Sequence, residues 1–188
     1  MTAAPLPQRL HPWHDLPAGP SPPELLTAVI EIPKDSRNKY ELDKPTGLYR
    51  LDRVLHSAMR FPGDYGFIPR TLAEDGDPLD ILVLTTVPVF VGCLIEVRPV
   101  GIFSLVDKGE KDEKILAVPV ADPFTREITD LPSLPRHALL EIEHFFLVYK
   151  DLEAARTQKQ ISNGFADAET ARADVLACME RYRASYPG

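Results

Sequence analysis

Cysteine is scarce in this chain, and neither a long apolar run nor an excess of basic residues is present. The two cysteines, Cys93 and Cys178, lie far apart, which indicates reduced, buried thiols in a cytosol rather than a disulfide scaffold. No apolar run approaches the roughly twenty residues that a membrane-spanning helix requires. The formal net charge of −7 argues against a nucleic-acid partner, because phosphate backbones are bound by basic faces. We therefore expect a cytoplasmic protein with neither a membrane nor a nucleic-acid partner.

Proline, in contrast, gathers at the start of the chain, in residues 1–23. We expect this segment to be an extended arm that lies on the surface or packs against a neighbouring subunit. We expect residues 1–188 as a whole to form a single domain. The arm has no charged region followed by an apolar stretch, so no signal peptide is expected. His11 and His14 flank Trp13 within it, and an anchoring tryptophan with incidental histidines is a simpler interpretation than a metal site.

The middle of the chain carries short apolar and alternating patterns that predict strands. We expect these strands at residues 27–32, 39–43, 48–55, 81–84, 94–103 and 115–120. Because turn residues separate them, they favour a closed or nearly closed antiparallel barrel. Two helices are expected at residues 133–150 and 167–182, with Asp167 as the N-cap of the second. The predicted fold class is α+β and mainly β, a barrel flanked by two main helices.

A dense acidic turn, Asp75-Gly76-Asp77-Pro78-Leu79-Asp80, is the most informative motif. Its carboxylates repel one another, and oxygen ligands at this density suit a hard divalent cation, Mg²⁺ above all. The apolar residues 81–84 follow directly, so the acids stand at the mouth of a rigid strand. A Ca²⁺ loop of the EF-hand kind is excluded, because Asp80 and Thr86 stand where that loop needs a glycine and a glutamate. A solvated acidic turn without a metal stays an open alternative.

A second charged segment, residues 107–114, lies between two expected strands. Alone it is an ordinary solvated hairpin loop, and it gains meaning only if folding carries Asp107 and Asp112 to the acidic turn. The basic residues need the same caution, because lysine and arginine are mostly solvated. Arg53 stands apart, since it shares a strand face with Tyr49 and is expected to be partly buried and paired.

Further short strings accompany the acidic turn along the chain. They are Val29-Ile30-Glu31-Ile32-Pro33, Asn38-Lys39-Tyr40-Glu41-Leu42-Asp43, Leu51-Asp52-Arg53, Asp64-Tyr65-Gly66-Phe67-Ile68, Arg98-Pro99-Val100-Gly101 and His144-Phe145-Phe146 with Tyr149-Lys150-Asp151-Leu152-Glu153. In this order, and with the acidic turn among them, these strings resemble the soluble inorganic pyrophosphatases of the first family. The resemblance runs from about Trp13 to the C-terminal helix, and the acidic turn is its most specific part.

The resemblance implies a five-stranded OB-like barrel with two helices outside it, and Mg²⁺-dependent hydrolysis of pyrophosphate to two orthophosphates. It implies Asp77 as the general base, with Tyr65 beside the nucleophile. Carried over by position, the metal ligands would be Glu31, Asp75, Asp80, Asp107 and Asp112. The groups that hold phosphate oxygens would be Lys39, Arg53, Tyr65, Lys114, Tyr149 and Lys150. Because bacterial members are commonly hexamers, a homohexamer is favoured.

Three positions depart from the family pattern. Phe61 stands where a tyrosine is expected, Arg156 where a lysine is usual, and Phe165 where a tryptophan is usual. None of them removes an expected metal ligand. Two other functions remain to be compared with the first: an OB-type nucleic-acid-binding module, which the negative charge opposes, and a family member without catalytic activity, which the retained acids oppose.

Overall fold

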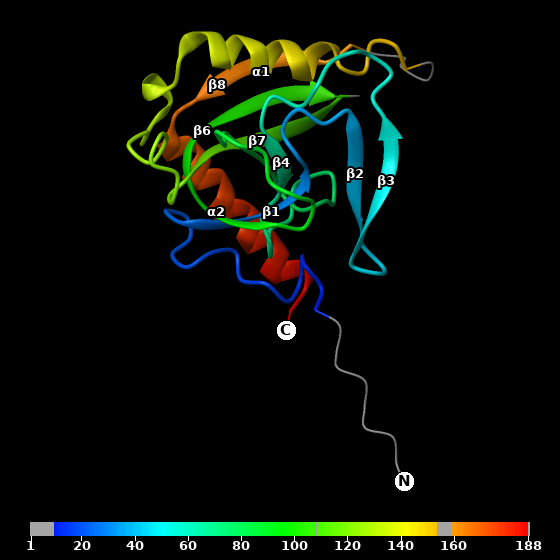
Figure 1. Ribbon diagram of the computed structural model, residues 1–188. Helices are drawn as coiled ribbons and strands as arrows, with labels where there is room; N and C mark the ends of the chain where they lie inside the picture. The colour runs from blue at the N-terminus through cyan, green and yellow to red at the C-terminus, as the bar shows by residue number, and fades with distance from the viewer. Residues whose placement is uncertain (1–9, 108, 154–158, 188) are drawn as a thin grey trace.

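The computed structural model describes residues 10–107, 109–153 and 159–187. Its centre is a ring of five strands in the order β1-β4-β5-β7-β6, closed by pairing between β1 and β6 (Figure 1). The strands are β1 (Leu26–Ile32), β4 (Asp64–Phe67), β5 (Asp80–Val83), β6 (Leu94–Asp107) and β7 (Glu110–Pro119). A further strand, β8 (Ile161–Ala166), pairs with the free side of β6. The five-stranded OB-like barrel expected from the sequence is confirmed.

One pairing in the ring differs from the expected antiparallel barrel. β5 and β7 run parallel, with Asp80 opposite Lys114 and Ile81 opposite Ile115. The parallel arrangement arises because β6 lies between them in sequence and hairpins directly onto β7. The parallel pairing places Asp80, at the start of β5, beside Lys114 in the charged part of β7.

The two helices cover different sides of the barrel (Figure 1). α1 (Arg136–Val148), preceded by the short 3₁₀ helix η1 (Leu131–Ser133), buries Ile142, Phe145 and Phe146 in one hydrophobic cluster. α2 (Ala168–Ser185) buries a stripe at helical spacing in a second cluster: Ala171, Val175, Cys178 and Met179. Each large apolar side chain buried in this way contributes about 1.5–3 kcal/mol relative to exposure. The predicted cap of α2 is confirmed, because Asp167 accepts a hydrogen bond from the Thr170 amide.

Two strands were not expected from the sequence. Residues 61–66 carry turn-forming residues, yet Asp64–Phe67 form β4, which is buried throughout. Gly66 is needed there because a Cβ would lie only 1.9 Å from the Val29 carbonyl oxygen of the neighbouring strand. β8 is the second addition. The expected charged loop at 107–114 also proves shorter, because β6 and β7 continue through most of it.

The strands β2 (Asn38–Asp43) and β3 (Leu48–Val54) form a hairpin that is a separate two-stranded sheet. Figure 1 shows this hairpin standing beside the barrel. Its Leu42 is buried in a third hydrophobic cluster with Trp13 and Phe67. The hairpin is thus anchored to the barrel at this point, while its strands project two rows of side chains to either side.

The described part of the N-terminal segment packs onto its own chain. Trp13 is only 2% exposed, and its indole Nε1 donates a hydrogen bond to the Thr71 carbonyl oxygen at 2.8 Å. Residues 1–9 of the expected arm lie outside the described residues.

Cys93 is half-buried and Cys178 is buried, and neither forms a disulfide. Among the described residues, no helix has both the length and the apolar character needed to cross a membrane.

Candidate active site

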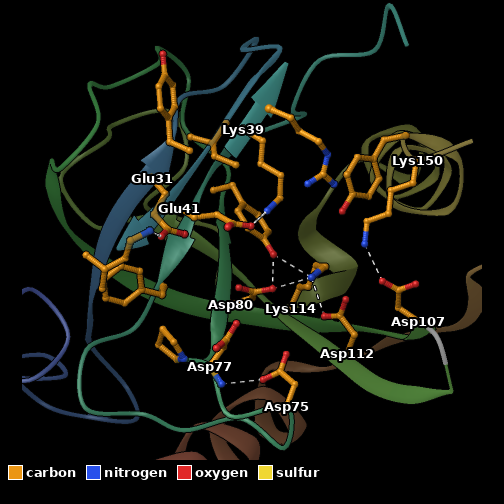
Figure 2. Close-up of a pocket in the computed structure, with 18 of the residues that line it drawn as sticks. Glu31, Lys39, Glu41, Asp75, Asp77, Asp80, Asp107, Asp112, Lys114 and Lys150 are labelled. Atoms are coloured by element: carbon orange, nitrogen blue, oxygen red, sulfur yellow. Dashed lines mark hydrogen bonds and ion pairs between the residues drawn. The ribbon is translucent and has the colours of Figure 1, made fainter. Parts of the chain in front are cut away.

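A cavity of about 520 Å³ opens between the barrel, the β2–β3 hairpin and the end of α1. The residues singled out in the sequence all line this cavity, although they come from separate parts of the chain. Its acidic members are Glu31, Asp75, Asp77, Asp80, Asp107 and Asp112. Its basic and phenolic members are Lys39, Arg53, Tyr65, Lys114, Tyr149 and Lys150. Figure 2 shows Lys39 and Lys150 on one side of the cavity and Asp75 and Asp77 on the other.

The acids are positioned by the turn before β5 and by the β6–β7 hairpin. In the turn, the Asp77 amide donates to Asp75 Oδ1 at 3.0 Å, and the Ala73 amide donates to the Asp77 carbonyl oxygen at 2.7 Å. Asp80 begins β5 and lies beside β7 through the parallel pairing. Because side chains alternate along a strand, Asp112 and Lys114 of β7 project to the same face. The parallel pair therefore joins the two acidic segments at one edge of the barrel, which is called the acidic edge below.

Lys114 lies at the centre of this acidic edge. Its Nζ is 2.7 Å from Asp80 Oδ2, 2.7 Å from Asp112 Oδ1 and 2.9 Å from the Tyr65 hydroxyl (Figure 2). Burial alone would lower the pKa of Lys114, but the charges of Asp112 and Asp80 outweigh it and hold this pKa well above its usual value. Lys114 is therefore fully cationic at neutral pH, and it neutralises part of the acidic edge.

Tyr65, on β4, donates a hydrogen bond to Asp80. Burial, followed by the negative charge of Asp80, raises the pKa of the Tyr65 hydroxyl well above its usual value. The phenol therefore stays neutral and serves as a hydrogen-bond donor. This hydrogen bond connects β4 to the acidic edge.

Two further ion pairs stand at the far end of the cavity. Lys150, just after α1, places its Nζ 2.7 Å from Asp107 Oδ2. Burial opposes the charge of Lys150, but the neighbouring Tyr149 and Asp107 raise its pKa above the ordinary value. Arg53 of β3 donates from Nε to Glu153 at 2.8 Å, which agrees with the expectation that this arginine is partly buried and paired. These cations are held by the protein, but their charge still faces the cavity.

Glu31, on β1, occupies a different environment. Burial raises its pKa to about 8, although the Leu42 amide, 2.6 Å from its Oε1, acts in the opposite direction. Repulsion from Asp80 adds to the rise. Glu31 is thus a carboxylate whose charged form lacks a strong cationic partner in the described structure, and a cation beside it would favour ionisation.

The chemistry of these donors fits a hard divalent cation. Carboxylate oxygens are the ligands that Mg²⁺ prefers, and several of them face one water-accessible cavity. Within the described residues, no three acidic, histidine or cysteine side chains are close enough to form a ready-made metal cage. Asp80 and Asp112 already enclose a cation, the ammonium group of Lys114, so this edge is electrostatically suited to positive charge.

Four polar residues of the cavity lining were not proposed from the sequence: Tyr40, Glu41, Lys44 and Glu153. Glu41 follows Lys39 by two positions on β2, so strand alternation could have found it. Lys44 follows the end of β2, and no local pattern distinguishes it from a solvated turn lysine.

Two of the three departures from the family pattern are packed aromatic residues. The Phe61 ring centre lies 5.5 Å from that of Tyr65, and Phe61 is 2% exposed. The Phe165 ring centre lies 4.8 Å from that of Phe103, and Arg156 lies outside the described residues.

An OB-like barrel whose cavity sets clustered carboxylates against fixed cations is typical of an enzyme of phosphoryl-transfer chemistry. The family model for inorganic pyrophosphatase matches residues 28–183, and the chain belongs to this family of hydrolases, which act on the anhydride bond of pyrophosphate. The family implies a divalent metal cofactor.

Curated relatives and solved structures agree with this assignment. The chain is 46% identical over 173 residues to soluble inorganic pyrophosphatase 1 of Arabidopsis thaliana, covering 92% of this chain and 80% of the relative. It is 47% identical over 175 residues to a soluble inorganic pyrophosphatase of Oryza sativa subsp. japonica, covering 93% and 80%. The crystal structure of the Thermus thermophilus inorganic pyrophosphatase superposes with a TM-score of 0.89 at 44% identity, covering 93% of this chain and 99% of that one. A Coxiella burnetii pyrophosphatase gives 0.84 at 41% identity, covering 89% and 99%.

Proposed function

We propose that this pyrophosphatase uses Mg²⁺ and that Asp77 is the general base that activates the attacking water. The observation that carries the proposal is the cavity, in which an accessible carboxylate stands beside an acidic edge and opposite a set of cations. Asp77 is about half exposed, so water reaches its carboxylate. A base must be within reach of both water and substrate, and the place of Asp77 in the lining of the cavity supports this assignment.

The proposed metal ligands are Glu31, Asp75, Asp80, Asp107 and Asp112. When bound, Mg²⁺ would supply positive charge to the pyrophosphate oxygens and lower the pKa of the attacking water. Without cations, the acidic edge would repel a polyanion. Dependence on a metal therefore follows from the charge of the chain's own side chains.

The substrate is proposed to lie with its phosphate oxygens against the basic side of the cavity. Lys39 and Arg53 extend from the hairpin, Lys114 from β7, and Tyr149 and Lys150 from the end of α1. Arg53 offers a planar fork of donors, and the lysines offer point charges. Tyr149 adds a neutral hydrogen bond. As the anhydride bond breaks, these donors stabilise the charge that grows on the departing phosphate, while Asp77 takes the proton from the water.

We also propose that residues 1–188 act as one domain, in the cytoplasm, and assemble as a homohexamer. The exposed apolar side chains Val87 and Phe90, each 71% exposed, with Leu94 at 52%, offer surface for contact between copies.

Metal dependence is tested by measuring phosphate release from pyrophosphate after complete chelation of divalent ions. We expect no measurable turnover in the chelated enzyme and full recovery when Mg²⁺ is returned, because the acidic edge repels the substrate until it is neutralised. Phosphate release from a simple phosphate monoester under the same conditions is the control for anhydride specificity. Rapid pyrophosphate hydrolysis in the chelated enzyme would contradict the proposed metal role.

Phe61 allows a test of the departure from the family pattern. Phe61→Tyr adds a hydroxyl beside Tyr65 in a site that is only 2% exposed. We expect a change in kcat/KM of less than about tenfold and a loss of about 1–2 kcal/mol in the free energy of unfolding, because a buried hydroxyl needs a partner. Steady-state kinetics over a range of pH and Mg²⁺ concentration, with urea unfolding, measure both. Phe103→Tyr, which places a hydroxyl elsewhere in the same cluster, is the control. An unchanged rate under all conditions would show that the hydroxyl has no role in this chain.

A further inference from the structure

Lys44 extends from a well-defined turn at the tip of the β2–β3 hairpin. The Thr46 and Gly47 amides both donate to the Asp43 carbonyl oxygen, at 3.0 and 2.8 Å. Arg50 on β3 donates to the Asp43 carboxylate at 2.9 Å, which closes the turn from its other side. The backbone of Lys44 is therefore held in place by the turn.

The ammonium group of Lys44 forms an ion pair with the Asp77 carboxylate. The two residues line the same cavity but belong to different walls of it. Lys44 comes from the hairpin, which is a sheet separate from the barrel, whereas Asp77 comes from the acidic turn that leads into β5. The ion pair thus joins the hairpin to the acidic turn within the lining of the cavity.

The N-terminal segment supports Lys44 from behind. His11 donates from Nε2 to the Lys44 carbonyl oxygen at 2.7 Å, while its Nδ1 accepts from the Trp13 amide at 3.3 Å. Both contacts agree with a single neutral tautomer of His11. The ammonium group of Lys44 also lies 5.8 Å from the centre of the Trp13 ring, within range of a cation–π contact. Because Trp13 is itself buried, it gives the lysine a fixed surface to lie on.

We propose that Lys44 is a positioning residue that holds the hairpin against the acidic turn, with His11 and Trp13 as its support. The hairpin carries Lys39 and Arg53, so the Lys44–Asp77 contact sets the spacing between two phosphate-binding cations and the acids opposite them. Both partners are about half exposed, and an exposed ion pair of this kind is weak. The Lys44–Asp77 contact, called the latch below, therefore holds the hairpin only weakly, and pyrophosphate can enter and orthophosphate can leave.

Kinetics separate this role from a purely structural one. We expect Lys44→Met to raise the KM for pyrophosphate by about three- to tenfold, as the loss of one weak ion pair would, while kcat stays within about twofold. Lys44→Arg should restore most of the KM, because it keeps a cation of similar reach. Lys111→Met removes a half-exposed cation that lies outside the hairpin and does not line the cavity, and it should leave both constants unchanged. A fall in kcat alone would show that Lys44 acts on Asp77 and not on the hairpin, and would overturn the proposal.

Amide hydrogen exchange supplies a readout that does not depend on activity. In Lys44→Met, peptides covering residues 39–53 should exchange faster than in the wild type, and His11→Ala should produce a smaller change in the same direction. Lys111→Met again serves as the control, and circular dichroism confirms that each variant is folded. Unchanged exchange together with unchanged KM in Lys44→Met would overturn the latch. The kinetic part rests on the proposed function, but if Asp77→Asn were fully active, the base assignment would fail and the exchange result would still decide the latch.

Discussion

Asp77→Asn is expected to lower kcat by about 10²- to 10⁴-fold, the range typical of a lost general base. Asparagine has nearly the same shape but cannot take a proton from water. The turn should persist, because its hydrogen bonds use the backbone amide and carbonyl of residue 77 and the carboxylate of Asp75. Pre-steady-state and steady-state phosphate release measure the loss, and calorimetric titration with Mg²⁺ should show little change in metal affinity.

Glu74→Gln is the matched control for this substitution. Glu74 is an exposed acid in the same segment that does not line the cavity, so removing its charge should leave kcat close to that of the wild type. If Glu74→Gln lost as much activity as Asp77→Asn, the effect would come from the net charge of the turn and not from the base. If purified Asp77→Asn turned over like the wild type, another group would have to accept the proton.

The sequence allowed much of the barrel to be predicted because strand signals are local. β1, β2, β3 and β5 appear within one or two residues of their expected bounds. β4 could not be predicted, because Gly66 within it and Gly63 just before it resemble the glycines of a turn. Gly63 and Gly66 instead permit close approach of neighbouring backbones: a Cβ would lie 2.8 Å from the Val83 carbonyl oxygen at the first and 1.9 Å from the Val29 carbonyl oxygen at the second. β8 is a short edge strand of mixed polar and apolar residues with a left-handed glycine, Gly164, and it carries little signal of its own.

The site shows the same division between local and long-range information. Strand alternation is enough to put Asp112 and Lys114 on one face. The meeting of that face with the acidic turn depends on the parallel register between β5 and β7, which no local pattern specifies. Lys44 illustrates the limit, because its place in the cavity depends on how a separate hairpin packs against the barrel. The resemblance to a known family named most of the charged and phenolic residues that line the cavity, but not this one.

Lys114→Met is expected to affect stability and activity together, because Lys114 is almost fully buried between two partly exposed carboxylates. Methionine fills a similar volume without the charge and leaves Asp80 and Asp112 facing each other. With allowance for solvent screening of the carboxylates, we expect the metal-free protein to lose about 1–3 kcal/mol of unfolding free energy. Mg²⁺ should recover part of this loss, because a divalent cation replaces the missing positive charge. Urea unfolding with and without Mg²⁺ measures both effects.

The pH dependence of this loss has a definite sign. Because the pKa of Lys114 is raised in the folded protein, its stabilising contribution is fully present below the unfolded-state pKa of about 10.4 and is lost only as pH rises through the folded-state value. The wild type and Lys114→Met should therefore differ at neutral pH and converge in strongly alkaline solution. Measurements at neutral and alkaline pH in the presence of a chelator test this, and a difference that stayed constant up to that range would contradict it.

Catalysis should suffer more than stability in Lys114→Met. In the proposed binding mode the substrate loses a buried cation that faces its phosphate oxygens, and we expect kcat/KM to fall by at least about 10²-fold, or roughly 3 kcal/mol. Lys111→Met is the matched control, since Lys111 lies on the same strand but is half exposed, does not line the cavity and pairs with Glu113 instead. Equal losses in the two variants would show that the effect comes from the loss of positive charge on β7 in general and not from the position of Lys114. A loss confined to Lys114→Met would mean that the barrel holds this one ammonium group where the acids and the phosphate both require it.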